Sequence, residues 1–303
     1  MRLNTNVIPL YRYRRAGEKI TDAVDFIKRN RRPLSRLAIY FFLPVAMLHS
    51  LALYGIYNFT DDLFGDDFLS NLYLMTVTFF ATATVIYTVV LTLVALNRDS
   101  ECDVLSDMPM RQLWRTLWRI LWRSAVAMAF DCAIACMLIA IGEVLLLTVV
   151  GIMFIPALPM AVALLAGVLA MLPIVYVLDR NGSLNFFQAL SRSWKLSWAH
   201  GMRLMGLVFA LYFIMTILQG MVDLPFYLLI YFKQTLWLDN LSAAYEQTAL
   251  YSVLLYLLGV VKCFYSYLTY SFAVMVIVYH YGSVAENRED ASIMSDIQHF
   301  EEL

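Results

Sequence analysis

The fold class follows from residues 124–178, which read SAVAMAFDCAIACMLIAIGEVLLLTVVGIMFIPALPMAVALLAGVLAMLPIVYVL. An α-helix needs about 20 apolar residues to cross about 30 Å of hydrocarbon, so this stretch is far too long for one crossing. Residues 151–159 supply the glycine and the prolines expected where a chain reverses. The stretch therefore predicts two membrane-spanning helices joined as a hairpin.

Further apolar runs lie on both sides of this hairpin. The chain is 61% apolar and only 15% charged, against about 45–50% and 25% in an average soluble domain, and one soluble core cannot bury that surplus. We expect an all-α, polytopic membrane protein with a basic N-terminal segment over 1–36, a membrane domain over 37–281 and an acidic tail over 282–303. The six predicted spans cover residues 37–57, 72–96, 124–150, 156–178, 204–222 and 248–281.

Lysine and arginine gather on one side of the predicted spans. Of the 22 in the chain, ten precede the first span, five lie in residues 97–123, four in 179–203 and one in the C-terminal tail. Cytoplasmic loops retain these residues during membrane insertion. We therefore expect both termini on the cytoplasmic side.

Three segments that precede spans are amphipathic at the helical period, and the clearest covers residues 110–123. Arginine and tryptophan form neighbouring stripes there, and residues 184–198 repeat the pattern, while residues 20–29 do so more weakly. This layout is typical of helices in the membrane interface, although ordinary topology anchoring uses the same residues. The residues expected at lipid headgroups are Arg111, Trp114, Arg115, Trp118, Arg119, Trp122, Arg123, Arg192, Trp194 and Lys195.

The order of these elements predicts a threefold internal repeat. Each unit would consist of an interfacial helix, a span, an outer loop and a second span. The outer loop of the third unit, residues 223–247, is aromatic and apolar in its first half. We expect it to form a short interfacial or re-entrant helix.

Three ionisable residues lie within predicted spans, namely Asp131, Glu143 and Lys262. Such groups are costly in a membrane and are candidate functional residues by default. An ion pair between Glu143 and Lys262 is the favoured interpretation; a proton or ion relay, or unpaired groups that reach interfacial water, are the alternatives. A threonine stripe on the second span, which is better explained by helix packing than by a polar path, consists of Thr78, Thr82, Thr84, Thr88 and Thr92.

The motifs of common enzymes are missing from the sequence. It contains no HExxH, no GxSxG, no P-loop, and no cluster of cysteine and histidine at metal-ligand spacing. We therefore predict no catalytic residue, no cofactor and no metal site.

The segment from Val177 to Gly206 carries a family resemblance. Its residues Ala189, Leu190, Ser193, Trp194, Lys195 and Leu196 precede the fifth predicted span. This arrangement resembles the bacterial glycerophosphoryl diester phosphodiesterase membrane-domain superfamily, in particular its Bacteroidetes-type members. The resemblance implies a six-span module in the bacterial inner (cytoplasmic) membrane. Because no catalytic domain accompanies it, hydrolysis of glycerophosphodiesters is not implied.

Together these features predict a non-enzymatic scaffold, partner subunit or lipid-organising module. We expect membrane lipids as partners, anionic ones among them, and a membrane or cytoplasmic protein, but no nucleic acid. The alternative is a transporter or channel for a small solute, ion or lipid that uses Asp131, Glu143, Lys262 and the threonine stripe. An interfacial lipid enzyme would need converging polar side chains, and the sequence offers no such set.

Overall fold

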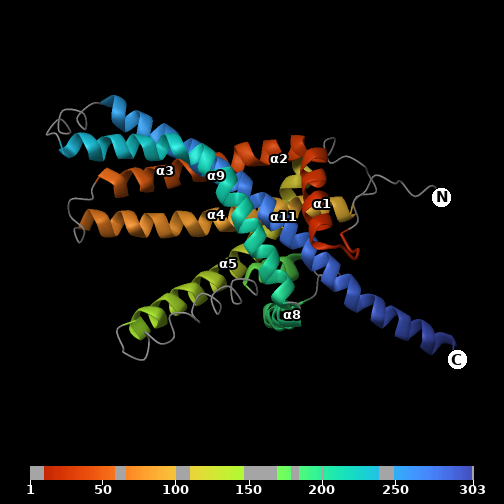
Figure 1. The fold of residues 1–303 in the computed structure, drawn as a ribbon. Coiled ribbons are helices and arrows are strands. Elements are labelled where there is room, and N and C mark those ends of the chain that lie inside the picture. Colours follow the sequence, from red (N-terminus) through yellow and green to blue (C-terminus); the bar gives the residue numbers. More distant parts are fainter. Residues whose placement is uncertain are drawn as a thin grey trace. The chain divides into compact units, whose positions relative to one another are not determined.

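The computed structural model describes residues 10–58, 66–99, 110–146, 169–178, 184–199, 201–238 and 249–301. Within these ranges all regular structure is helical, which confirms the predicted all-α class for this part of the chain (Figure 1). The helices are α1 (Ala16–Arg29), α2 (Arg31–Leu37), the π-helix η1 (Ala38–Phe42), α3 (Leu43–Asn58), α4 (Asp66–Asp99), α5 (Met110–Leu146), α8 (Phe186–Ala199), α9 (Gly201–Leu238), α11 (Ala249–Glu301) and the shorter helix Leu169–Leu178.

Five described helical segments are long and apolar enough to cross a membrane, and they overlap the first, second, third, fifth and sixth predicted spans, the third only over residues 124–137. They are Arg31–Gly55, Tyr73–Asn97, Leu113–Met137, Gly201–Phe232 and Leu250–Asn287. Of the predicted fourth span, only the apolar helix Leu169–Leu178 lies within the described residues. The helices are those of a membrane-embedded protein, and the count of six spans stays a prediction.

Helix α5 differs from the prediction of a separate interfacial helix before the third span. It runs without a break from Met110 to Leu146. Its residues Leu113, Leu117 and Ile120 are buried, whereas Trp114, Trp118 and Trp122 are 57–74% exposed. The leucine face therefore packs against protein instead of acyl chains. The contact of Ser124 Oγ with Thr88 Oγ1, at 2.6 Å, holds this face against α4.

Helix α9 also continues further than predicted. It passes through Pro225 and ends at Leu238, so the first half of the expected outer loop is part of the same helix. Proline removes one backbone hydrogen bond from a helix, and packing can offset that loss. Phe226 and Ile230 supply such packing, since they form a buried cluster with Tyr251 and Leu255 of α11.

Helices α1 and α8 lie where the other two amphipathic segments were predicted, and a side chain from the first turn caps each of them. The backbone N–H of Arg15 donates to Glu18 Oε2 at 3.0 Å, and that of Asn185 donates to Gln188 Oε1 at 3.2 Å. In both contacts the side chain at position N3 accepts the backbone N–H of the N-cap residue, as in a capping box. The interfacial location of these helices stays a prediction.

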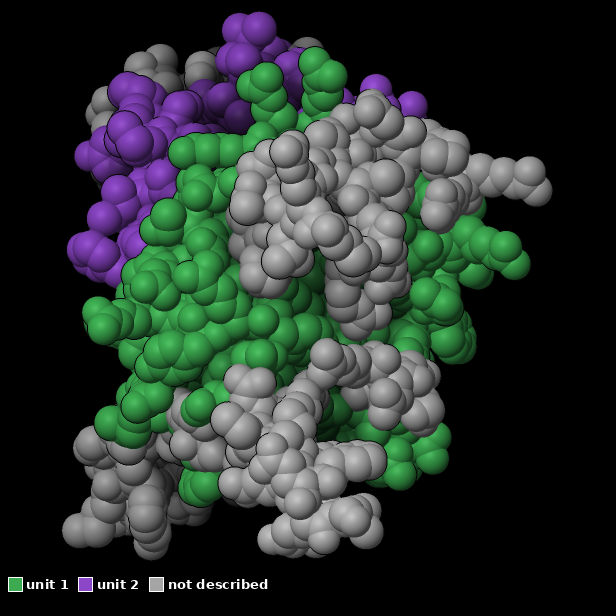
Figure 2. All heavy atoms as spheres, turned by 90° about the vertical axis from the view of Figure 1, so that its right-hand side faces the viewer, with its two compact units in different colours: residues 1–34, 87–211, 272–303 green, residues 35–86, 212–271 purple. Residues whose placement is uncertain are grey.

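The described residues form two compact units, coloured separately in Figure 2. Unit 1 comprises residues 1–34, 87–211 and 272–303, and unit 2 comprises residues 35–86 and 212–271. The boundaries cut through α4, α9 and α11, so each of these helices contributes to both units. The division into a basic segment, a membrane domain and a tail concerns membrane topology and stays a prediction, as does the threefold repeat.

Unit 1 is held together by contacts between segments that are distant in sequence. The hydroxyl of Tyr87 in α4 donates to the carbonyl oxygen of Ala170 at 3.1 Å. Phe186 of α8 meets Tyr176 edge to face, with ring centres 5.7 Å apart. Arg123 of α5 lies over the same Tyr176 ring at 4.6 Å. These contacts join α5, α8 and the helix Leu169–Leu178 into one core.

Unit 2 contains buried polar contacts among apolar helices. His49 Nδ1 lies 2.7 Å from the hydroxyl of Tyr267, and the two rings stack. Gln219 of α9 donates to Thr269 Oγ1 of α11 at 2.9 Å. Membrane helices associate through contacts of this kind because no hydrophobic effect drives them together. The contact of His49 with Tyr267 joins α3 to α11 within unit 2.

Candidate functional site

The N-terminal segment, residues 10–29, packs against the last part of α11 that belongs to unit 1. The backbone N–H of Arg14 donates to Ser283 Oγ at 3.0 Å. A Cβ atom at Gly282 would lie 2.2 Å from the carbonyl oxygen of Leu10, so glycine is required for the two backbones to approach. Phe26 meets Tyr279 edge to face, with ring centres 6.3 Å apart. Residues from both ends of the chain therefore build one site.

Arg14 is the buried centre of this contact, with a side chain that is 1% exposed. Its Nε donates to Asp22 Oδ2 at 2.5 Å, and its Nη1 donates to the carbonyl oxygens of Leu10 and Arg12 at 2.9 and 3.1 Å. Its guanidinium also lies over the Tyr279 ring at 4.7 Å. A buried charge is tolerated when it is paired and hydrogen-bonded in this way. Arg14 thus has a structural role.

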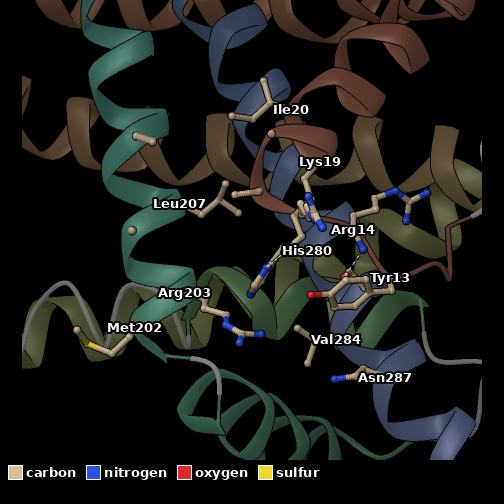
Figure 3. A pocket seen from close by; sticks show the side chains of 16 residues that line it. Tyr13, Arg14, Lys19, Ile20, Met202, Arg203, Leu207, His280, Val284 and Asn287 are labelled. Carbon is tan, nitrogen blue, oxygen red and sulfur yellow. Dashed lines mark hydrogen bonds between the residues drawn. The ribbon is translucent and has the colours of Figure 1, made fainter.

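Beside Arg14 lies a pocket of about 460 Å³, within the range of about 300–1,000 Å³ typical of ligand sites. We call it the basic pocket (Figure 3). Its lining comes from the N-terminal segment, from the first turns of α9 and from α11. The lining residues are Tyr13, Arg14, Arg15, Ala16, Gly17, Lys19, Ile20, Met202, Arg203, Gly206, Leu207, Ala210, His280, Ser283, Val284 and Asn287.

The charge of this lining is one-sided. It contains three arginines, a lysine and a histidine, and no aspartate or glutamate among the described residues that form it. Asp22 compensates Arg14 from outside the pocket. Within the described part of the chain, neither Lys19 nor Arg203 forms an ion pair. The lining of the pocket is therefore basic, and no described lining residue supplies a carboxylate.

Lys19 is 8% exposed, and its Nζ lies 2.8 Å from His280 Nδ1. Burial, together with the nearby positive charges of Arg203 and Arg14, lowers the pKa of Lys19 from its ordinary 10.5 to about 8. An ammonium group only donates hydrogen bonds, so Nδ1 of His280 accepts, and a neutral imidazole then carries its proton on Nε2. A strongly perturbed group in a pocket is a common mark of a functional site.

Lys262, Asp131 and Glu143 do not belong to this pocket. Lys262 lies in unit 2, where its Nζ donates to the Tyr227 hydroxyl at 2.7 Å and lies 3.8 Å from Asp223 Oδ2. Asp131 lies in unit 1, and its buried Oδ1 has no hydrogen-bond partner among the described residues. The side chain of Glu143 lies outside the described part, so its pair with Lys262 stays a prediction.

The residues expected at lipid headgroups also lie apart from the pocket. Arg115, Arg119, Lys195 and the tryptophans among them are exposed, and Arg123 and Arg192 are partly buried. Trp194 stacks on Trp198 with ring centres 5.9 Å apart. The side chain of Arg111 lies outside the described residues. All five threonines of the predicted stripe are buried, which agrees with a packing role.

Sequence reasoning did not single out Lys19, Arg203 or His280. One signal was present for Lys19, which shares a helix face with the buried Ala23 and Phe26 four and seven residues later. A lysine on the buried face of an amphipathic helix is unusual. His280 likewise interrupts the apolar end of the last span.

The basic pocket is suited to binding an anion. Lysine and arginine hold phosphate or carboxylate groups through short, charge-assisted hydrogen bonds. The described residues contain no group of three or more His, Cys, Asp or Glu side chains that could hold a metal ion. No protein-family model, no curated protein and no solved structure matches the chain.

Proposed function

We propose that the protein is a non-enzymatic, lipid-organising protein of the bacterial inner membrane that binds an anionic lipid headgroup in its basic pocket. One observation carries this proposal: Lys19 and Arg203 share a pocket whose described lining contains no carboxylate. Lys19 is buried beside other cations, and burying a charge costs free energy unless an opposite charge is present. A bound anion would supply that charge.

The origin of the lining residues supports a lipid at this position. They belong to the N-terminal segment, to the start of α9 and to the end of the last span, and the Lys and Arg distribution predicts the cytoplasmic side for all three. Anionic lipids attract basic residues at the cytoplasmic leaflet by about 1 kcal/mol for each Lys or Arg. The apolar Ile20, Leu207 and Ala210 add a surface for the lipid's glycerol and first methylene groups.

Native mass spectrometry of the protein in lipid nanodiscs tests the proposal. The wild type should retain phosphatidylglycerol in preference to phosphatidylcholine, and Lys19→Gln with Arg203→Gln should abolish that preference. Lys28→Gln is the matched control, because Lys28 is exposed and nine residues, about two and a half helical turns, from Lys19 on α1. Equal retention of both lipids by the wild type would reject the proposal.

A transporter is the second candidate, and the polar contacts of unit 2 favour it. His49, Tyr267, Asp223 and Lys262 lie within segments that could cross a membrane, where polar groups are costly. In the described structure, however, these groups bind one another, at 2.7 Å for His49 with Tyr267 and 3.8 Å for Lys262 with Asp223. A transport function would require that proteoliposomes containing the wild-type protein take up solute and that those containing Lys262→Met do not.

Membership of the glycerophosphoryl diester phosphodiesterase membrane-domain superfamily is also part of the proposal. It rests on the residues around Trp194 and on the span pattern. A scaffold that binds a protein partner is compatible with lipid binding, because α8 and the arginine stripe of α5 are not used by the pocket.

A further inference from the structure

We infer that the basic pocket selects a phosphate monoester over a phosphate diester, an inference that rests on the proposed function. A monoester carries about 1.5 to 2 negative charges at neutral pH and has three terminal oxygens. The diester of a headgroup such as phosphatidylglycerol carries one negative charge and has two such oxygens. The two ligands therefore differ in charge and in the number of hydrogen bonds that they accept.

The charge of the lining favours the monoester. Asp22 compensates Arg14, and Glu18 lies beside Arg15, which leaves Lys19 and Arg203 as lining cations that form no ion pair within the described residues. A diester would neutralise one of these two charges, whereas a monoester would neutralise nearly both. The ligand with more charge relieves more of the repulsion that Arg203 and Arg14 exert on Lys19.

The placement of the hydrogen-bond donors in the pocket also favours a phosphate monoester. Lys19 comes from α1, Arg203 from α9, and Ser283 and Asn287 from α11, and all four line the pocket. Figure 3 shows the side chains of Lys19, Arg203 and Asn287. The donors of the lining therefore come from three different helices. The Ser283 hydroxyl accepts the backbone N–H of Arg14, which leaves its own hydrogen to donate. The guanidinium of Arg203 can contact two oxygens at once.

Two sources could supply this chemistry, namely a lipid such as phosphatidic acid or a soluble phosphate ester. The experiment measures lipid retention by native mass spectrometry in nanodiscs that contain phosphatidic acid, phosphatidylglycerol or phosphatidylcholine as the minority lipid. Phosphatidic acid should exceed phosphatidylglycerol by about fivefold, as expected for one further charge at the membrane surface. Addition of glycerol 3-phosphate then distinguishes the sources. If it displaces the lipid at equal concentration, the ligand is a soluble monoester; if it does not, the ligand is a lipid monoester.

The outcomes separate this inference from the proposed function. Equal retention of phosphatidic acid and phosphatidylglycerol, both above phosphatidylcholine, would overturn the monoester inference and leave headgroup binding intact. Retention of neither above phosphatidylcholine would overturn both.

Two variants test the residues. Lys19→Gln should reduce the retention of phosphatidic acid to that of phosphatidylglycerol, while Lys28→Gln leaves the fivefold ratio unchanged. Arg203→Gln should have the same effect as Lys19→Gln. Because Arg203 is exposed, its substitution still tests the inference if loss of the buried Lys19 impairs folding. An unchanged ratio in Arg203→Gln would overturn the inference.

Discussion

Arg14 and Lys19 are both buried cations of the N-terminal segment, yet their charges are compensated differently. Arg14 has a carboxylate at 2.5 Å, two carbonyl oxygens and an aromatic ring. Lys19 has a neutral imidazole at 2.8 Å and two arginines nearby. The first environment is that of a structural residue, and the second is that of a site which lacks its counter-charge. The two residues therefore predict different results on substitution.

Replacing Asp22 by asparagine should destabilise the protein through Arg14. The variant leaves the buried guanidinium without its anion, and loss of a charge-assisted hydrogen bond costs about 1.5 to 3 kcal/mol. The melting temperature in detergent should fall by several degrees. Asp25→Asn on the same helix is the control, because Asp25 forms no ion pair within the described part of the chain. Equal shifts in both variants would contradict this role of Arg14.

The pKa of Lys19 predicts how the stability of the ligand-free protein depends on pH. Its folded value of about 8 lies below the ordinary 10.5, so between these values the unfolded chain binds the additional proton. The free energy of unfolding should therefore increase as the pH rises from about 8 to 10.5. Below about 8, Lys19 is protonated in both the folded and the unfolded state, so its unfavourable contribution to stability should be constant. Thermal melts of the wild type and Lys19→Met measure this effect, which the variant should lack.

Anion binding should show the opposite dependence on pH. Lys19 loses its charge above about 8, while the guanidinium groups of Arg203 and Arg14 keep theirs. Affinity for phosphatidylglycerol, which does not titrate in this range, should fall by up to about tenfold for each pH unit above that value. Titration of the protein in nanodiscs at pH 7, 8 and 9 checks the slope. If the affinity of Lys19→Met falls with pH in the same way, the titration of another group causes the pH dependence.

Among the elements, the N-terminal segment depends on one close approach to α11. Gly282→Ala would place a Cβ atom 2.2 Å from the Leu10 carbonyl oxygen, and backbone cannot yield as a flexible side chain can. We expect the segment to detach and trypsin to cleave it many times faster, at sites that include Arg14 and Arg15. Gly220→Ala is the matched control, because its Cβ meets nothing within 4 Å. Unchanged cleavage of Gly282→Ala would show that the segment is held elsewhere.

The sequence predicted those helices whose position depends on local features of the chain. Apolar runs and Lys and Arg counts are local properties, and the five described candidate spans overlap predicted ones. The start of α5 and the continuation of α9 depend on packing against α4 and α11, which periodicity does not reveal. Lys262 was recognised as costly, but its contact with Asp223 requires knowledge of which helices are neighbours. Lys19 and His280 lie 261 residues apart, so only the fold brings the pocket together.

Considered as a whole, the chain presents its two ends to each other. Lys19 and Arg14 precede the first span, and His280 and Ser283 lie at the end of the last one, yet these residues are in direct contact within unit 1. We expect segments that are in contact to lie on the same side of a membrane. The number of crossings between them must then be even.

We therefore predict six crossings, although the described residues contain five segments that could cross. A sixth crossing requires that the helix Leu169–Leu178 belong to a longer span within residues 156–178, as the hairpin in the sequence predicts. Fusions of alkaline phosphatase and of green fluorescent protein to each terminus provide the test, since the former is active only outside the cytoplasm and the latter fluoresces only inside it. Both ends should fluoresce and neither should show phosphatase activity, with a fusion after residue 62 as the outer control. Opposite results at the two ends would mean an odd number of crossings, and the basic pocket could not then be built from both ends of one chain.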